Sequence, residues 1–288
     1  MGEHFPVSES ENAASIFDSG AFESGVYTRT IQPRNPDGGW HLVLHGLGDH
    51  SGAHTWAASL LAATGSEVVA IDWPGCGKSG LSPSHLPTVP EAKQIINSVI
   101  EKKGGPPRGV FAHSTGGFFL MSWLLDKGAS DRLPKWVWFS SPLISPRYGQ
   151  GELKILAARL AGHLFPRLTL KTGVTPSACY HGGNEEAKWK DPLFHNKVSV
   201  RAGASLLEEA DVIRSSFENL PAELVYLIVQ GWNDPVCPPE FSRDMLNRLS
   251  ANDKTYLLVH DGLHEPFHEK ECEPLTNAIR AWLRSRNL

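Results

Sequence analysis

The chain has 288 residues, of which 41% are hydrophobic and 20% are charged, and its formal net charge is -4. This composition is typical of a globular protein with a sizeable core, and the length suits one α/β domain with an insertion. The chain is slightly acidic and has no long run of like charges, so it lacks the clustered positive charge that binds nucleic-acid phosphates. This argues against nucleic-acid binding.

The first 24 residues are polar and predict a partly flexible N-terminal segment without the basic and apolar regions of a signal peptide. No stretch reaches 18 uninterrupted apolar residues, the length typical of a membrane-spanning helix. Four scattered cysteines contain no Cys-x-x-Cys pair: Cys76, Cys179, Cys237 and Cys272. This spacing favours reduced thiols in a cytoplasmic protein over disulfides or a zinc site. No feature predicts an oligomeric state.

Seven short runs rich in β-branched and aromatic residues predict buried strands. In chain order they are residues 26–32, 41–46, 67–72, 109–114, 136–141, 225–231 and 254–262. Most are separated by stretches with helical spacing, at residues 54–65, 89–103, 116–128, 239–250 and 274–285. This alternation favours a mostly parallel sheet with helices on both faces, whose ligands bind beyond the carboxyl ends of the strands.

The alternation stops between residues 142 and 218, a connection of about 75 residues that is longer than an ordinary loop. Four leucines there recur about one helical turn apart: Leu153, Leu156, Leu160 and Leu164. A second helical stretch is predicted over 198–217. We expect residues 142–218 to form a helical cap over the active face; two surface helices packed on the sheet are the alternative.

The sequence FAHSTGG, residues 111–117, places Ser114 between a predicted buried strand and a predicted helix. A tight turn there lifts the serine hydroxyl out of the sheet and directs N–H groups of the helix N-terminus at the same point. Such a strained turn needs small neighbours. Gly116 meets this need, whereas Ala112 stands where glycine is common. On its own the pattern also fits a helix-capping serine.

Three further segments place functional groups near strand ends. The N–H of Leu47, after the strand 41–46, can join that of Thr115 as a pair of donors to a developing oxyanion. Asp234 follows the strand 225–231, where its carboxylate can orient a histidine. His264 follows the next strand. Taken singly, each segment also fits an ordinary turn or loop.

Two nearby histidines, His260 and His268, are rivals of His264 as the catalytic base, and Asp72 is the runner-up for the acid. Asp72 is expected instead to accept hydrogen bonds from turn amides. The chain order Ser, Asp, His at the ends of separate strands is that of the α/β-hydrolases.

Seven motifs follow one another as in the monoacylglycerol lipase and lysophospholipase group of that superfamily: HGLGDHSG, IDWPGCGKSG, AHSTGG, FSSPLIS, DPL, QGWNDPVC and DGLHEPFHE. The resemblance extends from about residue 25 to 286. It implies an α/β-hydrolase fold with a mostly parallel central sheet, helices on both faces, and a helical cap inserted after the sixth core strand. The implied core is 25–141 with 219–288, and the implied cap is 142–218.

The resemblance further implies a serine esterase that cleaves single-chain lipid esters through an acyl-enzyme, with no metal and no organic cofactor. Ser114 would be the nucleophile, His264 the general base and then acid, and Asp234 the carboxylate that orients the histidine. The backbone N–H groups of Leu47 and Thr115 would form the oxyanion hole.

Several alternatives remain open. The same machinery fits a lysophospholipase, a general carboxylesterase or a serine aminopeptidase, for which Glu185 and Glu186 are a close acidic pair in the cap. A different class is a non-catalytic protein that binds a hydrophobic ligand. The leucine stripe, with its basic residues, fits either the pocket lining or peripheral contact with a membrane.

Two local features depart from the group or adjoin its motifs. Ala53-His54 stands near the point where the group often has Arg-Tyr. Cys237, three residues after Asp234, is expected to be a buried, inert thiol near the site, where a thiol reagent would inhibit by steric block.

Overall fold

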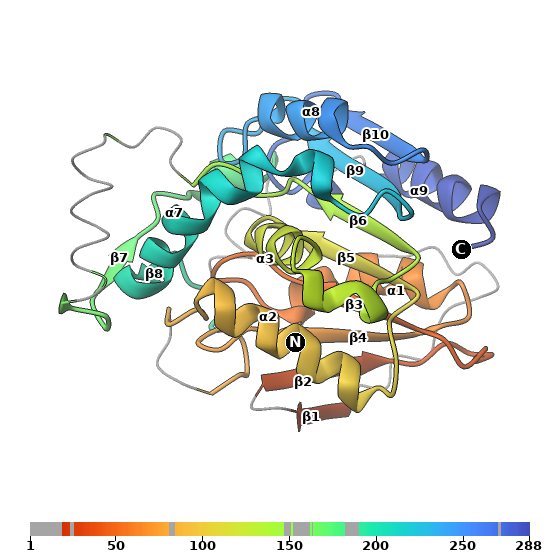
Figure 1. The fold of residues 1–288 in the computed structure, drawn as a ribbon, viewed down its shortest axis with the longest axis horizontal. Helices are drawn as coiled ribbons and strands as arrows, with labels where there is room; N and C mark the ends of the chain where they lie inside the picture. The colour runs from red at the N-terminus through yellow and green to blue at the C-terminus, as the bar shows by residue number, and fades with distance from the viewer. Residues whose placement is uncertain are drawn as a thin grey trace.

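The computed structural model describes residues 19–23, 26–80, 84–146, 151, 162, 164–181, 190–269 and 272–288. Its main sheet has eight strands in the order β1-β2-β4-β3-β5-β6-β9-β10 (Figure 1). Their bounds are β1 Ser19–Glu23, β2 Val26–Ile31, β3 Trp40–Leu44, β4 Glu67–Asp72, β5 Gly109–His113, β6 Trp136–Ser140, β9 Val225–Gly231 and β10 Lys254–Val259. β1 and β2 join the edge antiparallel, and the other neighbouring strands run parallel. The predicted mostly parallel sheet is confirmed.

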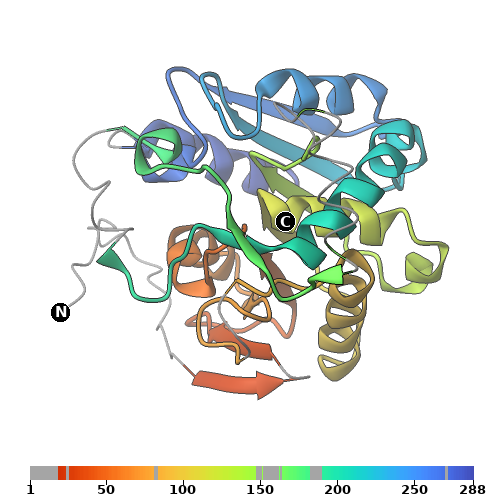
Figure 2. The same cartoon turned by 90° about the vertical axis from the view of Figure 1, so that its left-hand side faces the viewer.

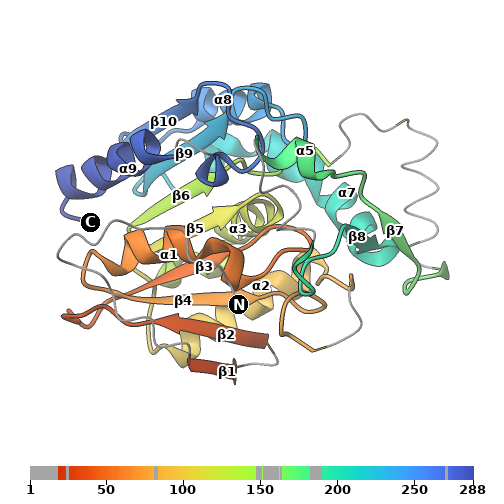
Figure 3. The ribbon, with the colours of Figure 1, turned by 180° about the vertical axis from the view of Figure 1, so that it is seen from behind.

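Helices cover both faces of this sheet. α2 (Val89–Lys102), α3 (Thr115–Leu124) and α8 (Pro239–Arg248) lie in front in Figure 1, and α1 (Thr55–Ala62) and α9 (Glu273–Ser285) lie behind, as Figure 3 shows. Along β5, Val110 and Ala112 belong to the core cluster on the α3 side, whereas Phe111 belongs to the cluster on the α1 and α9 side. Successive residues of β5 thus face opposite sides of the sheet, and helices cover both sides. Every residue of the strand is therefore buried, so the strand appears in the sequence as a continuous apolar run.

Residues 142–218 connect β6 to β9 and are called the inserted segment below. Its described elements are β7 (Thr169–Lys171), α5 (Pro176–Cys179), β8 (Lys197–Ser199) and α7 (Val200–Ser215). β7 and β8 form a small antiparallel pair, and α7 contacts α2 and α3. Figure 2 shows these elements on the side of the molecule that faces the viewer.

The predicted helix over 198–217 is present as α7, whereas most of the leucine-rich stretch from 153 to 164 lies outside the described residues. β1, β7 and β8 were not predicted from the sequence. Within the described part of the chain, no helix has the length and apolar character needed to cross a bilayer.

Candidate active site

Ser114 occupies a strained turn between β5 and α3. Its backbone has φ 50° and ψ -119°, in the region of positive φ that residues with a side chain rarely adopt. The turn is fixed because the Ser114 N–H donates to Ser140 O at 3.0 Å, and Ser114 O accepts from Leu143 N at 3.0 Å. Ala112 is fully buried and belongs to the apolar core cluster, so its methyl group is accommodated there.

The structure brings Ser114, His264 and Asp234 together. His264 Nε2 lies 3.0 Å from Ser114 Oγ, and His264 Nδ1 lies 2.9 Å from Asp234 Oδ2. All three residues are buried, with exposures of 7%, 4% and 3% for Ser114, His264 and Asp234. Because a carboxylate only accepts hydrogen bonds, Nδ1 of a neutral His264 carries the proton and Nε2 is left to accept from the serine hydroxyl.

The end of β9 holds the Asp234 carboxylate in place. Its Oδ1 accepts from the backbone N–H groups of Val236 at 2.8 Å and Cys237 at 2.9 Å. The amide of Gln230 donates to Oδ2 at 2.9 Å. A buried carboxylate that accepts this many hydrogen bonds is held in one position beside the imidazole.

Burial acts to lower the pKa of His264, but the adjacent Asp234 carboxylate raises it, and the net pKa lies well above the usual 6.5. The imidazolium that forms when His264 takes a proton is therefore stabilised in place. Burial also raises the pKa of the Cys237 thiol beside the triad, so this thiol stays protonated. Cys237 is 4% exposed, as expected of a buried, inert cysteine.

The loop after β3 carries the Leu47 N–H, and Thr115 begins α3. Both residues line the same cavity as Ser114. His45 Nε2 accepts from Trp73 N–H at 2.9 Å, so the proton of its neutral ring is on Nδ1, which donates to Gly46 O at 2.6 Å. Burial lowers the pKa of His45 to about 4, so its ring stays neutral at pH 7 and keeps one donor and one acceptor nitrogen. The Gly46 carbonyl shares a peptide plane with the Leu47 N–H, so the His45 bond orients that group.

The rival residues of the sequence prediction have other partners. Asp72 Oδ1 accepts from Ser51 N at 2.6 Å and Oδ2 from Lys78 N at 2.7 Å, which is the expected structural role. The His260 side chain is 88% exposed. His268 Nε2 donates to Ala53 O at 3.2 Å. Neither of these histidines replaces His264 at the serine.

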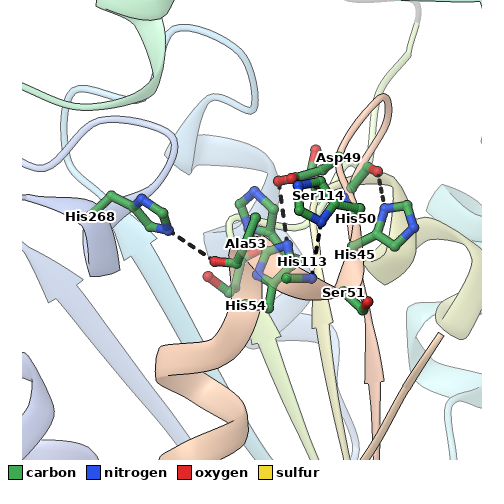
Figure 4. Close-up of polar contacts among 12 residues, drawn as sticks. His45, Asp49, His50, Ser51, Ala53, His54, His113, Ser114 and His268 are labelled. Atoms are coloured by element: carbon green, nitrogen blue, oxygen red, sulfur yellow. Dashed lines mark hydrogen bonds and ion pairs between the residues drawn. The ribbon is translucent and has the colours of Figure 1, made fainter. Parts of the chain in front are cut away.

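His54, at the point where the resembled group often has tyrosine, is buried among aromatic rings that include Phe111 and Phe267. Its Nε2 lies 3.4 Å from Asp49 Oδ2. Figure 4 shows Asp49, His113, His54 and Ala53 near Ser114, with His268 to one side and joined to Ala53 by a dashed line.

A cavity of about 270 Å³ opens at Ser114 and is mostly apolar. Six of its apolar lining residues come from the inserted segment: Leu143, Val174, Phe194, Val198, Leu206 and Leu207. Two buried carboxylates, Asp49 and Glu265, also line it, and sequence analysis had not selected them. Glu265 adjoins His264 in the sequence, and Asp49 follows Leu47 by two positions. Glu185 and Glu186 lie outside the described residues.

Among the described residues, the ligand atoms of Asp234, Cys237 and His264 form a group within 4.8 Å that has the dimensions of a metal site. A metal there would need a Cys237 thiolate, whereas burial raises the pKa of that thiol. It would also displace the proton that His264 Nδ1 donates to Asp234. The donor set therefore fits a hydrogen-bonded Ser-His-Asp triad better than a metal centre.

Comparison with known proteins identifies the family of the chain. Residues 38–271 match the model of the family described as serine aminopeptidase, S33. The chain belongs to this family. It is an α/β-hydrolase and a serine ester hydrolase, as the sequence predicted.

The crystal structure of the Paleococcus ferrophilus monoacylglycerol lipase is 31% identical, with a TM-score of 0.82 over 90% of this chain and 98% of that one. A monoacylglycerol lipase of Mycolicibacterium smegmatis is 26% identical over 90% of this chain and 91% of the relative. The phospholipase YtpA of Bacillus subtilis is 25% identical over 84% of this chain and 93% of the relative.

An uncharacterised abhydrolase domain-containing protein of Dictyostelium discoideum is 28% identical over 85% of this chain. The match covers only 26% of that relative's length.

Proposed function

We propose that the protein hydrolyses carboxylic esters of single-chain lipids, monoacylglycerols first among them, through an acyl-enzyme on Ser114. The observation that carries this proposal is the contact of 3.0 Å between His264 Nε2 and Ser114 Oγ at an apolar cavity. The names of the Paleococcus and Mycolicibacterium relatives support monoacylglycerol as the substrate.

In the first half-reaction, His264 Nε2 takes the Ser114 hydroxyl proton while Oγ attacks the ester carbonyl carbon. The carbonyl oxygen becomes an oxyanion, which the N–H groups of Leu47 and Thr115 stabilise. One such donor contributes roughly 3 to 4 kcal/mol to the transition state. Collapse of the tetrahedral intermediate expels the alcohol, which takes the proton from His264.

In the second half-reaction, water attacks the acyl-enzyme and His264 again serves as base and then as acid. Asp234 remains ionised throughout and keeps the imidazole in the correct tautomer. Apolar side chains such as Val198 and Leu206 offer the acyl chain a surface to bury. We propose residues 142–218 as the cap that supplies this surface.

The activity test is a panel of p-nitrophenyl esters of increasing chain length, together with monoacylglycerol and lysophosphatidylcholine. Ser114→Ala is expected to abolish hydrolysis, and a fluorophosphonate probe is expected to label the wild type but not this variant. Ser130→Ala, which removes an exposed serine hydroxyl, is the matched control. Retained activity in Ser114→Ala would refute the assignment.

The panel also separates two head groups. Faster turnover of lysophosphatidylcholine than of monoacylglycerol would favour a lysophospholipase, in agreement with the name of the Bacillus relative. A preference for monoacylglycerol would support the leading proposal.

We further propose that the inserted segment contacts lipid surfaces. Its large apolar side chains around β7 include some of the most exposed in the described chain: Leu164 at 72%, Phe165 at 62%, Leu168 at 51% and Leu170 at 49%. Arg167 and Lys171 are exposed beside them, which is typical of an interfacial surface. Co-sedimentation with anionic vesicles is expected to weaken in Phe165→Glu but not in Val212→Glu, which alters an exposed valine of α7. Equal binding of all three proteins would remove this membrane proposal.

A further inference from the structure

The residues from Asp191 to His195, in the inserted segment, are bonded to the loop that carries the Leu47 N–H. Figures 2 and 3 show the chain before β8 beside the loops at the ends of β3 and β4. Two hydrogen bonds join residues 191–195 to the loop after β3, and a third joins them to Gly75 in the loop after β4. One uses the Asp191 side chain, one the backbone of His195, and one the His195 ring.

The first bond is from His50 to Asp191. His50 Nδ1 accepts from Gly52 N–H at 3.1 Å, so the proton of a neutral His50 is on Nε2, which donates to Asp191 Oδ2 at 2.9 Å. The other carboxylate oxygen, Oδ1, accepts from Leu193 N–H at 2.8 Å and shapes the turn of the DPL motif. The side chains of His50 and Asp191 are 9% and 35% exposed, so the bond is partly buried.

The second contact is between His195 and Gly48. His195 N–H donates to Gly48 O at 2.9 Å. The approach is so close that a Cβ atom on Gly48 would lie 1.7 Å from His195 O, and Gly48 has φ +69°. The His195 ring is anchored in turn, because its Nε2 donates to Gly75 O at 3.0 Å.

These contacts bracket the proposed oxyanion donor. Leu47 lies between Gly46, whose carbonyl is held by His45, and Gly48, whose carbonyl is held by His195. Three residues after Leu47, His50 is tied to Asp191. The Gly46 end of this short loop is held by the neighbouring His45. The other end cannot rotate without breaking a hydrogen bond to His195 or Asp191, which are distant in sequence.

We propose that Asp191 and His195 are positioning residues of the oxyanion hole, which hold the Leu47 N–H in place from the inserted segment. This inference rests on the proposed serine hydrolase function. The inserted segment would then have two roles, since it lines the proposed acyl pocket and also supports the loop that carries the Leu47 N–H. Displacement of residues 191–195 would release Gly48 and His50 together. An oxyanion donor acts only in the transition state, so loosening it lowers kcat while KM stays nearly unchanged.

Asp191→Asn tests this in the full-length protein. The asparagine oxygen still accepts from Leu193 N–H, but its NH₂ group cannot accept from His50 Nε2–H. We expect kcat to fall about 10-fold to 100-fold on short and long p-nitrophenyl esters, with KM within about twofold, since removing a whole donor costs about 10²-fold to 10³-fold. The Ki of an alkyl trifluoromethyl ketone, which forms an oxyanion on Ser114, should rise by a similar factor.

Glu208→Gln, which removes an exposed carboxylate from α7, is the matched control and should behave as wild type. His50→Leu removes the same bond and also the contact of Nδ1 with Gly52 N–H, so its kcat should fall at least as far. The double variant should be no worse than the poorer single variant, because both variants break the bond between His50 and Asp191. A lower melting temperature with wild-type kcat and ketone Ki would overturn the positioning role. An inactive wild type, or an active Ser114→Ala, would instead refute the proposed function itself.

Discussion

The carbonyl oxygen of Leu44 lies 2.6 Å from the position that a Cβ atom on Gly116 would occupy. His45 O would lie 2.7 Å from the same atom. The first turn of α3 thus packs directly on the backbone at the end of β3, and only a residue without a side chain allows this approach. The nucleophile turn and the oxyanion loop are held at a fixed separation by this contact.

Gly116→Ala is therefore expected to push α3 away from β3. The extra methyl group meets backbone rather than a flexible side chain, so the expected loss is about 1 to 3 kcal/mol of unfolding free energy. kcat should fall as well, because Thr115 and Leu47 would move apart. Chemical denaturation and ester kinetics check both effects. Gly105→Ala, whose Cβ would meet nothing within 4 Å, is the control, and equal stability of the two variants would contradict the steric argument.

The pH dependence of kcat/KM should report His264. Catalysis needs its neutral form as the base, so activity rises with pH as His264 loses its proton. Because Asp234 raises the pKa of His264 against the effect of burial, this acidic limb should lie above the pH of 6.5 typical of a free imidazole. A pH profile with p-nitrophenyl butyrate measures it. A limb at or below pH 6.5 would contradict the assigned electrostatics.

Replacing Asp234 and Asp72 in turn by asparagine distinguishes the catalytic carboxylate from the structural one. Asp234→Asn puts an amide opposite His264 Nδ1 and favours the wrong tautomer, so kcat should fall about 10⁴-fold with little change in fold. Asp72→Asn should cost about 1 to 3 kcal/mol of stability, since turn amides lose an ionised acceptor, but less than about tenfold in kcat. Measurements of kcat and of thermal unfolding for the two variants show which carboxylate has which role. The reverse ranking would make Asp72 the functional acid.

The sequence predicted the main parts of the core because their signals are local. Apolar runs that end at glycine, proline or aspartate mark buried strands, and Ser114, Asp234 and His264 each follow such a run. Parallel strands place their carboxyl ends at one edge, so separate motifs converge there without any long-range information. The structure places His264 within hydrogen-bonding distance of both Ser114 and Asp234.

Other features depend on contacts that no local pattern shows. β7 and β8 have three residues each, and β1 lies at the edge of the main sheet. In such places neighbouring strands rather than composition select a strand. His50 and Asp191 are 141 positions apart, and each alone is an ordinary polar residue of a loop. Gly48 is an ordinary loop glycine in the sequence, and its positive φ and its close approach to His195 O are known only from the fold.

His41 on β3 makes the fold sensitive to acid. Burial, aided by the guanidinium of Arg108, lowers the pKa of His41 to about 4. Above pH 6.5 neither the folded nor the unfolded chain binds this proton. Between pH 6.5 and about 4 only the unfolded chain binds it, so stability falls as pH drops through this window. A shift from 6.5 to about 4 corresponds to about 3 kcal/mol once pH is below 4.

His41→Gln removes the titrating ring and keeps an N–H group that can donate to Thr64 Oγ1, the partner of His41 Nε2. Unfolding free energies measured in urea from pH 7 to 4 should therefore fall less steeply in this variant than in the wild type. His260→Gln removes a histidine whose side chain is 88% exposed and should keep the wild-type slope. If His41→Gln also keeps that slope, His41 does not titrate between folded and unfolded chains, and the acid sensitivity has another source.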